Sequence, residues 1–173
     1  SHLVDALLEK DYEVIVLDNF STGRPENLAH VSGKIELVEC DIKNPGSWEN
    51  KFEGVSKVFH LAALADIVPS IENPLNYYES NVNGTYNVME ACKKFAVGKV
   101  VYSASSSCYG IPSEYPTPEN SEIKPQYPYA LTKCLGEQIV MHWSNVYNVP
   151  AISLRFFNVY GPRSRTSGTY GAV

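Results

Sequence analysis

Short apolar runs alternate along the chain with longer stretches in which apolar residues recur every three or four positions. The short runs have the length and β-branched character of strands, at residues 13–17, 35–39, 57–61, 99–102 and 151–155. The longer stretches have the period of helices, at residues 1–10, 74–95 and 127–146. This order predicts an α/β fold with a doubly wound parallel sheet, covered on both faces and joined by right-handed crossovers.

The two ends of the chain lack the signals that begin and finish a protein. Residues 1–10 have the pattern of a helix already under way, without an initiating Met, a signal peptide or a transit sequence. Residues 164–173 are rich in Gly, Ser and Thr and show no closing element. We therefore expect one domain, residues 1–173, that begins and ends inside a larger protein and is incomplete at both ends.

Composition and charge exclude several functional classes. Hydrophobic residues make up 44% and charged residues 19% of the chain, as in globular domains with a core. The net charge of −5 speaks against a nucleic-acid-binding surface, and no apolar run is long enough to span a membrane. The widely spaced cysteines are expected to be buried, reduced thiols of a cytoplasmic protein and to bind no metal: Cys40, Cys92, Cys108 and Cys134.

The residues that follow each predicted strand are the first candidates for a site, because ligands of such sheets bind beyond the carboxyl ends of the strands. Asp18 follows the first strand and can accept hydrogen bonds from an adenosine ribose, where a carboxylate favours NAD over NADP. As a lone residue it is equally well explained as a cap or turn residue. Asp41 and the pair Ala62-Ala63 occupy similar positions, where turn and packing roles explain them as well.

Tyr129 and Lys133 form the strongest chemical signal, because residues four apart share one helix face. An ammonium near a phenol favours the phenolate and lowers the phenol pKa, so Tyr129 can act as a general base on a substrate hydroxyl. Chance alone gives roughly one such pair in a chain of this composition, and a half-buried helix tyrosine is the plain alternative. The serine cluster at 103–107 favours the catalytic interpretation, because a hydroxyl at this strand end can point into the same cleft.

Several motifs carry a family resemblance, in a fixed order and over essentially the whole chain. They are SHLV at 1–4, VLDN at 16–19, CDI at 40–42, HLAA at 60–63, YESNVNGT at 78–85, SASSSCYG at 103–110, PYALTK at 128–133 and LRFFNVYGPR at 154–163. Together they resemble the extended short-chain dehydrogenase/reductase family, and within it the nucleotide-sugar epimerases typified by UDP-glucose 4-epimerase. The resemblance implies a Rossmann-type fold, NAD as cofactor and a nucleotide sugar, a UDP-sugar above all, as substrate.

The resemblance also implies roles for individual residues. Tyr129 would take the proton of the sugar 4′-hydroxyl while hydride passes from C4′ to NAD. The 4-keto sugar would then rotate, and hydride would return to its other face. Lys133 would hold the nicotinamide ribose and lower the pKa of Tyr129, and Ser105 would bind the 4′-oxygen. The residues that match cofactor-binding positions are Asp18, Asn19, Ser21, Gly23, Asp41, Ile42, Leu61, Ala62, Ala63, Ala65, Ser80, Tyr129, Lys133 and Phe157. Those that match substrate-binding positions are Ser105, Ser107, Tyr129 and Asn158.

The chain departs from the family pattern at its beginning and at its end. The family opens with a strand and a Gly-x-x-Gly-x-x-Gly turn that binds pyrophosphate, and no glycines here have that spacing. The family's C-terminal substrate domain is also absent from this sequence. Because the missing first strand is central, between the strands ending at Asp18 and Leu61, we expect a rearranged sheet or a strand supplied by other residues.

The residues after Ser105 favour one subtype of the family. Dehydratases usually place Asp-Glu there, whereas this chain has Ser106 and Ser107, so we expect a 4-epimerase of UDP-glucose and UDP-galactose or of UDP-N-acetylhexosamines. The alternatives are a dehydratase or reductase of the same family and a non-catalytic nucleotide-binding scaffold. The resemblance also implies a homodimer formed through the helices at 74–95 and 127–146.

Overall fold

The computed structural model describes residues 1–163, and the chain divides into two compact units. The N-terminal unit consists of Ser1–Asp41 together with the residues from Asn158 onward. The central unit consists of Ile42–Phe157. Each unit has a parallel sheet of its own, so the predicted α/β class with parallel strands is confirmed.

The sheet of the N-terminal unit consists of two strands, β1 (Val14–Asp18) and β2 (Ile35–Glu39). They run parallel and pair in register along their whole length, so their carboxyl ends lie at the same edge. The helix α1 (His2–Leu8) contacts β1, and the 3₁₀ segment η1 (Pro25–Val31) lies between the two strands in sequence. Asp18 and Asp41 therefore occupy the strand-end positions that the sequence predicted.

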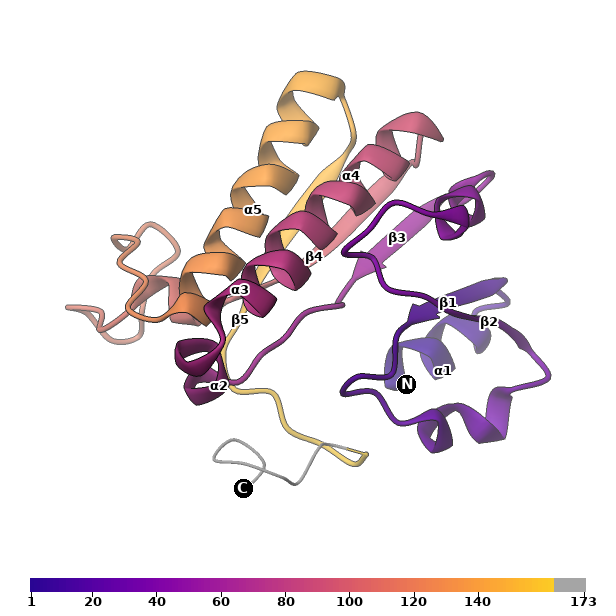
Figure 1. The fold of residues 1–173 in the computed structure, drawn as a ribbon, viewed down its shortest axis with the longest axis horizontal. Helices are drawn as coiled ribbons and strands as arrows, with labels where there is room; N and C mark the ends of the chain where they lie inside the picture. Colours follow the sequence, from indigo (N-terminus) through magenta and orange to yellow (C-terminus); the bar gives the residue numbers. More distant parts are fainter. Residues whose placement is uncertain (164–173) are drawn as a thin grey trace. The chain divides into compact units, whose positions relative to one another are not determined.

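The sheet of the central unit has three parallel strands in the order β3 (Lys57–His60), β4 (Lys99–Ser105) and β5 (Ala151–Phe156). Two helices, α4 (Gly84–Lys94) and α5 (Pro128–Tyr147), lie side by side along this sheet (Figure 1). Helix α4 contacts β3, and α5 contacts both β4 and β5. This β-α-β arrangement is the one expected of parallel strands, which need long crossover connections.

Shorter elements connect the strands and helices of the central unit. They are η2 (Ser47–Phe52), α2 (Ile67–Glu72), α3 (Pro74–Tyr78), the π-helical turn η3 (Glu79–Asn83) and the 3₁₀ turn η4 (Ser106–Tyr109). The helix predicted at 74–95 is thus the succession α3, η3 and α4. Its π turn is a local widening of the kind that often marks functional sites.

The predicted strands are all present, with one informative difference in length. β4 continues through Ser105, because Ser103, Ala104 and Ser105 pair with residues 154–156 of β5. Of the two outcomes expected for the missing strand, the rearranged sheet is wrong for residues 1–163, since β1 pairs only with β2, and β3 only with β4. A strand supplied by other residues stays a prediction.

The core of the central unit lies between the sheet and the two long helices. Val100, Tyr102 and Ala104 alternate along β4 and are buried, while the residues between them are half-buried. Met89 on α4 and Val140 on α5 are fully buried beside them. Close packing of this kind fixes the helix positions to within the tolerance of a methyl group.

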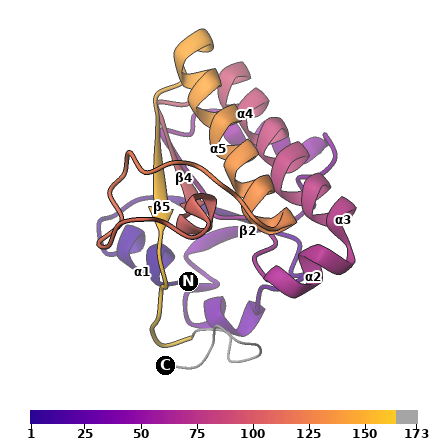
Figure 2. The ribbon, with the colours of Figure 1, turned by 90° about the vertical axis from the view of Figure 1, so that its left-hand side faces the viewer.

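The segment from 110 to 126, expected to be irregular and exposed, contains no helix or strand and runs from η4 to α5 (Figure 2). The cysteines are all unpaired, as predicted, and burial raises the pKa of Cys92 to about 12. Cys40 is only half-buried, whereas the other cysteines are buried. None of the helices between residues 1 and 163 has the length and apolar character needed to cross a membrane.

Candidate active site

Tyr129 and Lys133 stand one turn apart in the first part of α5. The helix begins at Pro128, a position where proline is favoured because its missing N–H has no helical partner. Residues four apart then project from the same face, so the phenol and the ammonium share it. Ser105 ends β4, whose contact with α5 brings this strand end beside the helix.

The side chain of Lys133 is buried, with only 4% of the residue exposed. Its ammonium lies 4.4 Å from the centroid of the Tyr102 ring and donates no hydrogen bond to other residues between 1 and 163. Burial lowers the pKa of Lys133 to about 8, and the nearby Glu137 carboxylate opposes this shift. A largely buried ammonium is costly unless acceptors take its protons, so the site fits ribose hydroxyls such as those of NAD.

The hydroxyl of Ser105 is held beside that of Ser107. Ser105 caps η4, where its Oγ accepts the backbone N–H of Ser107 at 3.2 Å. The two Oγ atoms lie 2.7 Å apart, within hydrogen-bond distance. One hydroxyl can therefore pass a proton to the other, and both stand at the carboxyl end of the central strand.

Asn81 connects the start of α5 with the loop that follows β3. Its side chain accepts the Leu64 N–H at 2.8 Å and donates to the Leu64 carbonyl at 3.0 Å and to Thr132 Oγ1 at 3.0 Å. Thr132 Oγ1 in turn donates to the Tyr129 carbonyl at 2.9 Å. Asn81 is 1% exposed, so these bonds are shielded from water and fix the first turn of α5 against the loop.

His60, at the end of β3, belongs to the same buried polar network. Thr85 Oγ1 donates to the Asn81 carbonyl at 2.6 Å and lies 2.9 Å from His60 Nε2. Because a threonine has one hydroxyl proton, His60 must be the donor in the second bond. Burial, with a contribution from Lys133, lowers the pKa of His60 to about 3, so the imidazole is neutral.

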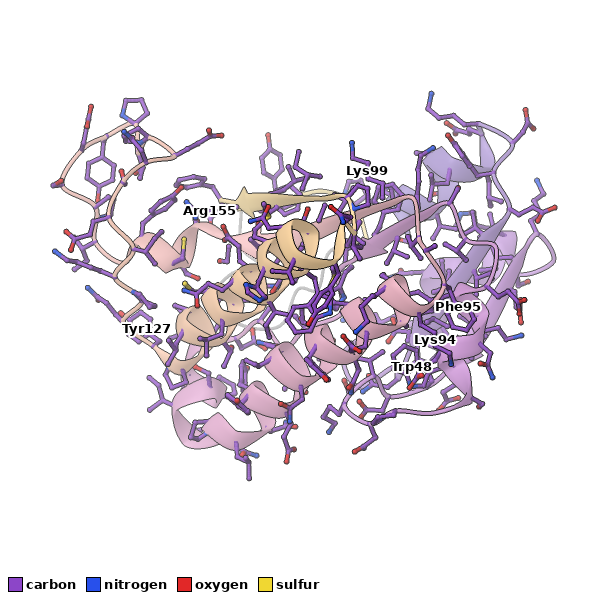
Figure 3. All side chains as sticks on the ribbon, turned by 90° about the horizontal axis from the view of Figure 1, so that it is seen from above. Trp48, Lys94, Phe95, Lys99, Tyr127 and Arg155 are labelled. Atoms are coloured by element: carbon purple, nitrogen blue, oxygen red, sulfur yellow. The ribbon has the colours of Figure 1, made fainter. Side chains whose placement is uncertain are left out.

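An ion pair anchors the segment after Ser105. Arg155 on β5 donates from Nη1 to the Tyr109 hydroxyl at 2.8 Å and to the Glu119 carbonyl at 3.1 Å. Its Nε and Nη2 bind the Glu137 carboxylate on α5 at 2.8–3.1 Å. Figure 3 shows Arg155 on β5 and Tyr127 at the start of α5. The guanidinium thereby joins η4, the following loop and α5.

In the N-terminal unit, the predicted adenosine-side residues form a compact turn after β1. Asp18 Oδ1 accepts the Phe20 N–H at 2.8 Å, and Asn19 Oδ1 accepts the Ser21 N–H at 3.0 Å. A Cβ on Gly23 would lie 2.8 Å from Asp18 Oδ2, so a larger residue at this position would require the carboxylate to shift. Asn19 Nδ2 also lies 3.3 Å from Asp41 Oδ2. The turn presents carboxylates at the strand ends, as binding of ribose hydroxyls requires.

The remaining predicted cofactor- and substrate-binding residues lie in several loops and turns. In the central unit, most cofactor candidates lie at or just after strand ends, and Ser80 lies in η3: Ile42, Leu61, Ala62, Ala63, Ala65, Ser80 and Phe157. Leu61 and Phe157 are 56% and 60% exposed, which is unusual for large apolar side chains and leaves them accessible to a ligand. Asn158 is exposed and belongs to the N-terminal unit, and its substrate-binding role stays a prediction.

Comparisons with known proteins identify the family. Residues 1–173 match the family model described as the NAD dependent epimerase/dehydratase family. The chain belongs to this family. NAD is the family's cofactor, and no group of three or more His, Cys, Asp or Glu side chains within residues 1–163 could hold a metal ion.

Relatives in the family align with nearly the whole chain. The UDP-glucose 4-epimerase of Mycolicibacterium smegmatis is 38% identical over 177 residues, covering 100% of this chain and 56% of that protein. The structure of UDP-N-acetylglucosamine 4-epimerase from Methanobrevibacter ruminantium, with UDP-N-acetylmuramic acid, has a TM-score of 0.92 at 34% identity, covering 99% and 55%. Thermus thermophilus UDP-glucose 4-epimerase in complex with NAD has a TM-score of 0.90 at 33% identity, covering 98% and 55%. The chain thus spans about half the length of these relatives.

The structure adds residues to this family site that the sequence analysis did not single out. The sequence gives Asn81, Thr85 and His60 no role beyond membership of a motif. It gives Tyr102 and Gly136 no role. A signal for Asn81 was present, since a polar residue that belongs to an apolar helix stripe needs buried partners. The partners themselves lie far away in the sequence and could not be named from it.

Proposed function

We propose that the protein containing this chain is an NAD-dependent nucleotide-sugar 4-epimerase that acts on UDP-hexoses. Residues 1–173 would be its cofactor-binding domain. The observation that carries the proposal is the buried Lys133 ammonium, one helical turn from Tyr129, beside a strand that ends in the hydroxyls of Ser105 and Ser107. UDP-glucose with UDP-galactose, or the matching UDP-N-acetylhexosamines, are the substrates that the family resemblance supports.

The roles of the residues follow from their surroundings. Tyr129 would take the proton of the sugar 4′-hydroxyl, and Lys133, close by in a water-poor site, would favour its phenolate. Ser105 would donate a hydrogen bond to the 4′-oxygen and pass protons between it and Tyr129, with Ser107 beside it. NAD, if bound there, would supply the reversible hydride acceptor for C4′. Lys133 would hold the nicotinamide ribose, and Asp18 would accept hydrogen bonds from the adenosine ribose.

The buried and turn geometries support NAD as the ligand. Lys133 is a buried ammonium whose protons ribose hydroxyls can accept, and Gly23 approaches the Asp18 carboxylate more closely than a Cβ would with that side chain as it stands. Burial of the Lys133 charge costs stability, and the close contact with Asp18 restricts which residue can stand at position 23. Packing alone requires neither feature. A carboxylate at Asp18 would also repel a 2′-phosphate, which supports NAD over NADP.

An epimerase is favoured over a dehydratase by the residues of η4. Elimination of water from a 4-keto sugar requires an acid that protonates the leaving hydroxyl. Ser106 and Ser107 follow Ser105, and neither can supply a carboxylic proton. A non-catalytic scaffold is disfavoured, because binding alone requires no phenolate base such as Tyr129 would be.

The test uses the complete protein that contains these residues, incubated with NAD and UDP-galactose. We expect UDP-glucose to appear, and Tyr129→Phe to reduce kcat by at least about 10²-fold, the usual contribution of a general base. Tyr147→Phe at the other end of α5 is the matched control and should retain full activity. A 4-keto-6-deoxy product, or NAD binding without turnover of any UDP-hexose, would contradict the proposal.

We also propose a homodimer of cytoplasmic location. Leu75 on α3 and Leu131 on α5 are 64% and 47% exposed and line a common apolar pocket with Tyr78 and Leu135. Exposed apolar patches of this kind favour association, and the long helices are where the resemblance puts it. The unpaired thiols support a reducing compartment. Light scattering of the complete protein should give twice the monomer mass. The Leu131→Glu variant should have the mass of a single monomer.

A further inference from the structure

Tyr102 holds Lys133 at two points. It lies on β4, is 0% exposed, and its hydroxyl lies 3.4 Å from the Lys133 carbonyl, to which it donates. The face of its ring lies 4.4 Å below the ammonium of the same lysine. Backbone and side-chain end of Lys133 are therefore both fixed against one aromatic residue of the neighbouring strand.

The surroundings leave Tyr102 no room to move. The His60 ring lies 5.4 Å from it at an interplanar angle of 44°. On the helix side, a Cβ on Gly136 would collide with the Tyr102 hydroxyl, so α5 approaches this ring as closely as only glycine permits. Thus β3, β4 and α5 together define the position of the ring.

Within residues 1–163, no carboxylate forms an ion pair with the ammonium. His60 on β3 and Glu137 on α5 interact electrostatically with Lys133, and the Tyr102 ring on β4 lies against its ammonium. Tyr129 and Cys134 on α5 interact electrostatically with Tyr102. Glu137 is the carboxylate among them, and its oxygens accept hydrogen bonds from Arg155. His60 is neutral and adds no repulsion, and burial raises the pKa of Tyr102, which keeps its ring uncharged.

We propose that Tyr102 is a positioning residue whose ring face holds the Lys133 ammonium in its charged form and aims it at Tyr129 and the cofactor ribose. A ring face attracts a cation without taking its protons, whereas a carboxylate would accept them and divert the ammonium. The N–H groups of Lys133 stay available to Tyr129 and the ribose for this reason. The inference rests on the proposed function for the role of Lys133, but the interaction itself exists without substrate.

The test changes the ring's electron density and leaves its shape nearly unchanged. In the complete protein, Tyr102→Phe keeps the ring face and loses the hydroxyl, and Tyr102→pentafluorophenylalanine also removes the attraction for a cation. The ionisation of Tyr129 is followed by ultraviolet tyrosinate absorbance, as the difference between each protein and its Tyr129→Phe derivative. NAD affinity is measured in parallel by titration, without a sugar substrate.

We expect Tyr102→Phe to leave the apparent pKa of Tyr129 within about 0.3 unit, and the NAD affinity within about twofold, of the parent values. The fluorinated ring should raise that pKa by about one unit and weaken NAD binding about tenfold, since a less stabilised ammonium deprotonates more easily. In active enzyme the pH range of full activity should become narrower. Its acid limb should move up with the pKa of Tyr129, and its alkaline limb should move down with the pKa of Lys133. A merely structural role would instead lower kcat evenly at all pH values.

Equal titration curves for the Phe and pentafluorophenylalanine proteins would overturn the proposal. The same holds if Tyr102→Phe alone causes the whole change, because the hydroxyl and not the ring face would then act on Lys133. Both readouts work in a protein that shows no epimerase activity. Failure of the proposed function would therefore appear as absent turnover with the ring effect intact.

Discussion

Arg155 Nη2 lies 2.8 Å from Glu137 Oε1, in an ion pair that joins β5 to α5. The side chains are 27% and 14% exposed, so the pair is largely shielded from solvent. Arg155 also donates to Tyr109 and to the Glu119 carbonyl, which ties the segment after Ser105 to the same point. The candidate serine and the candidate lysine are thereby attached to a common anchor.

Removal of one partner of this pair should be strongly destabilising. Arg155→Met leaves the Glu137 carboxylate without its donors, and we expect the free energy of unfolding of the complete protein to fall by about 2–4 kcal/mol. Urea denaturation measures the change. Lys124→Met is the control, because Lys124 and Glu122 form a pair that is 63% and 71% exposed, and it should change stability by less than about 0.5 kcal/mol. Equal effects of the two substitutions would contradict the anchor.

Lys133→Met should weaken NAD binding and at the same time stabilise the protein without NAD. The pKa of Lys133 is about 8 in the folded chain and 10.5 ordinarily, so the unfolded chain binds an extra proton between these pH values. Stability therefore rises with pH from 8 to 10.5, and below pH 8 the full cost of burying the charge is present. Met fills the same space without charge and should add about 1–3 kcal/mol at pH 7.

Denaturation at pH 7 and at pH 10 separates this effect from ordinary repacking. The advantage of Lys133→Met over the parent should be largest at pH 7 and smaller at pH 10. Activity of the variant should peak at higher pH than in the parent, because Tyr129 loses the nearby positive charge. If Lys133→Met is less stable than the parent at pH 7, burial of the charged Lys133 side chain does not destabilise the folded protein.

His60 should make the protein sensitive to moderate acid. Its pKa is about 3 in the folded chain and 6.5 ordinarily, so the unfolded chain binds the extra proton as the pH falls below 6.5. Stability is thus fully present above pH 6.5 and declines toward pH 3, by at most about 1.4 kcal/mol per pH unit. In His60→Asn the loss between pH 7 and 5 should be smaller. The exposed His142→Asn serves as control and should follow the parent curve.

Gly136→Ala should strain the contact between α5 and β4. The added Cβ would meet the Tyr102 hydroxyl and come within 3.2 Å of the Asn81 carbonyl, in a region where both neighbours are buried. We expect a loss of about 1–3 kcal/mol in spite of the better helix propensity of alanine. Gly33→Ala meets no atom within 4 Å and should be neutral or slightly stabilising. Thermal denaturation of both variants measures the difference in stability. An unchanged stability of Gly136→Ala would mean that α5 can shift away from Tyr102 on β4.

Local patterns are sufficient to predict the strands, the long helices and the central pair of the candidate site, but not the short elements η1, η2 and α2. The β-branched run at Ile35–Glu39 became β2 with the predicted bounds, and the three-to-four spacing from 127 onward became α5. Because the helical period alone puts residues four apart on one face, Tyr129 and Lys133 share a face whatever else the chain does. Asp18 and Asp41 likewise stand at strand ends because the strands were recognisable.

Tertiary structure decided which partners surround that pair. The serines at 103–105 look like a polar loop in the sequence, yet they extend β4, because β5 offers them backbone partners. Asn81 reaches Thr132 across 51 positions, and Arg155 reaches Tyr109 across 46. The burial that lowers the pKa of Lys133, and the ring of Tyr102 beneath it, likewise depend on how α5 packs on β4. A sequence pattern reports the period and polarity of neighbouring residues, whereas desolvation and contact between distant residues exist only once the elements have packed together.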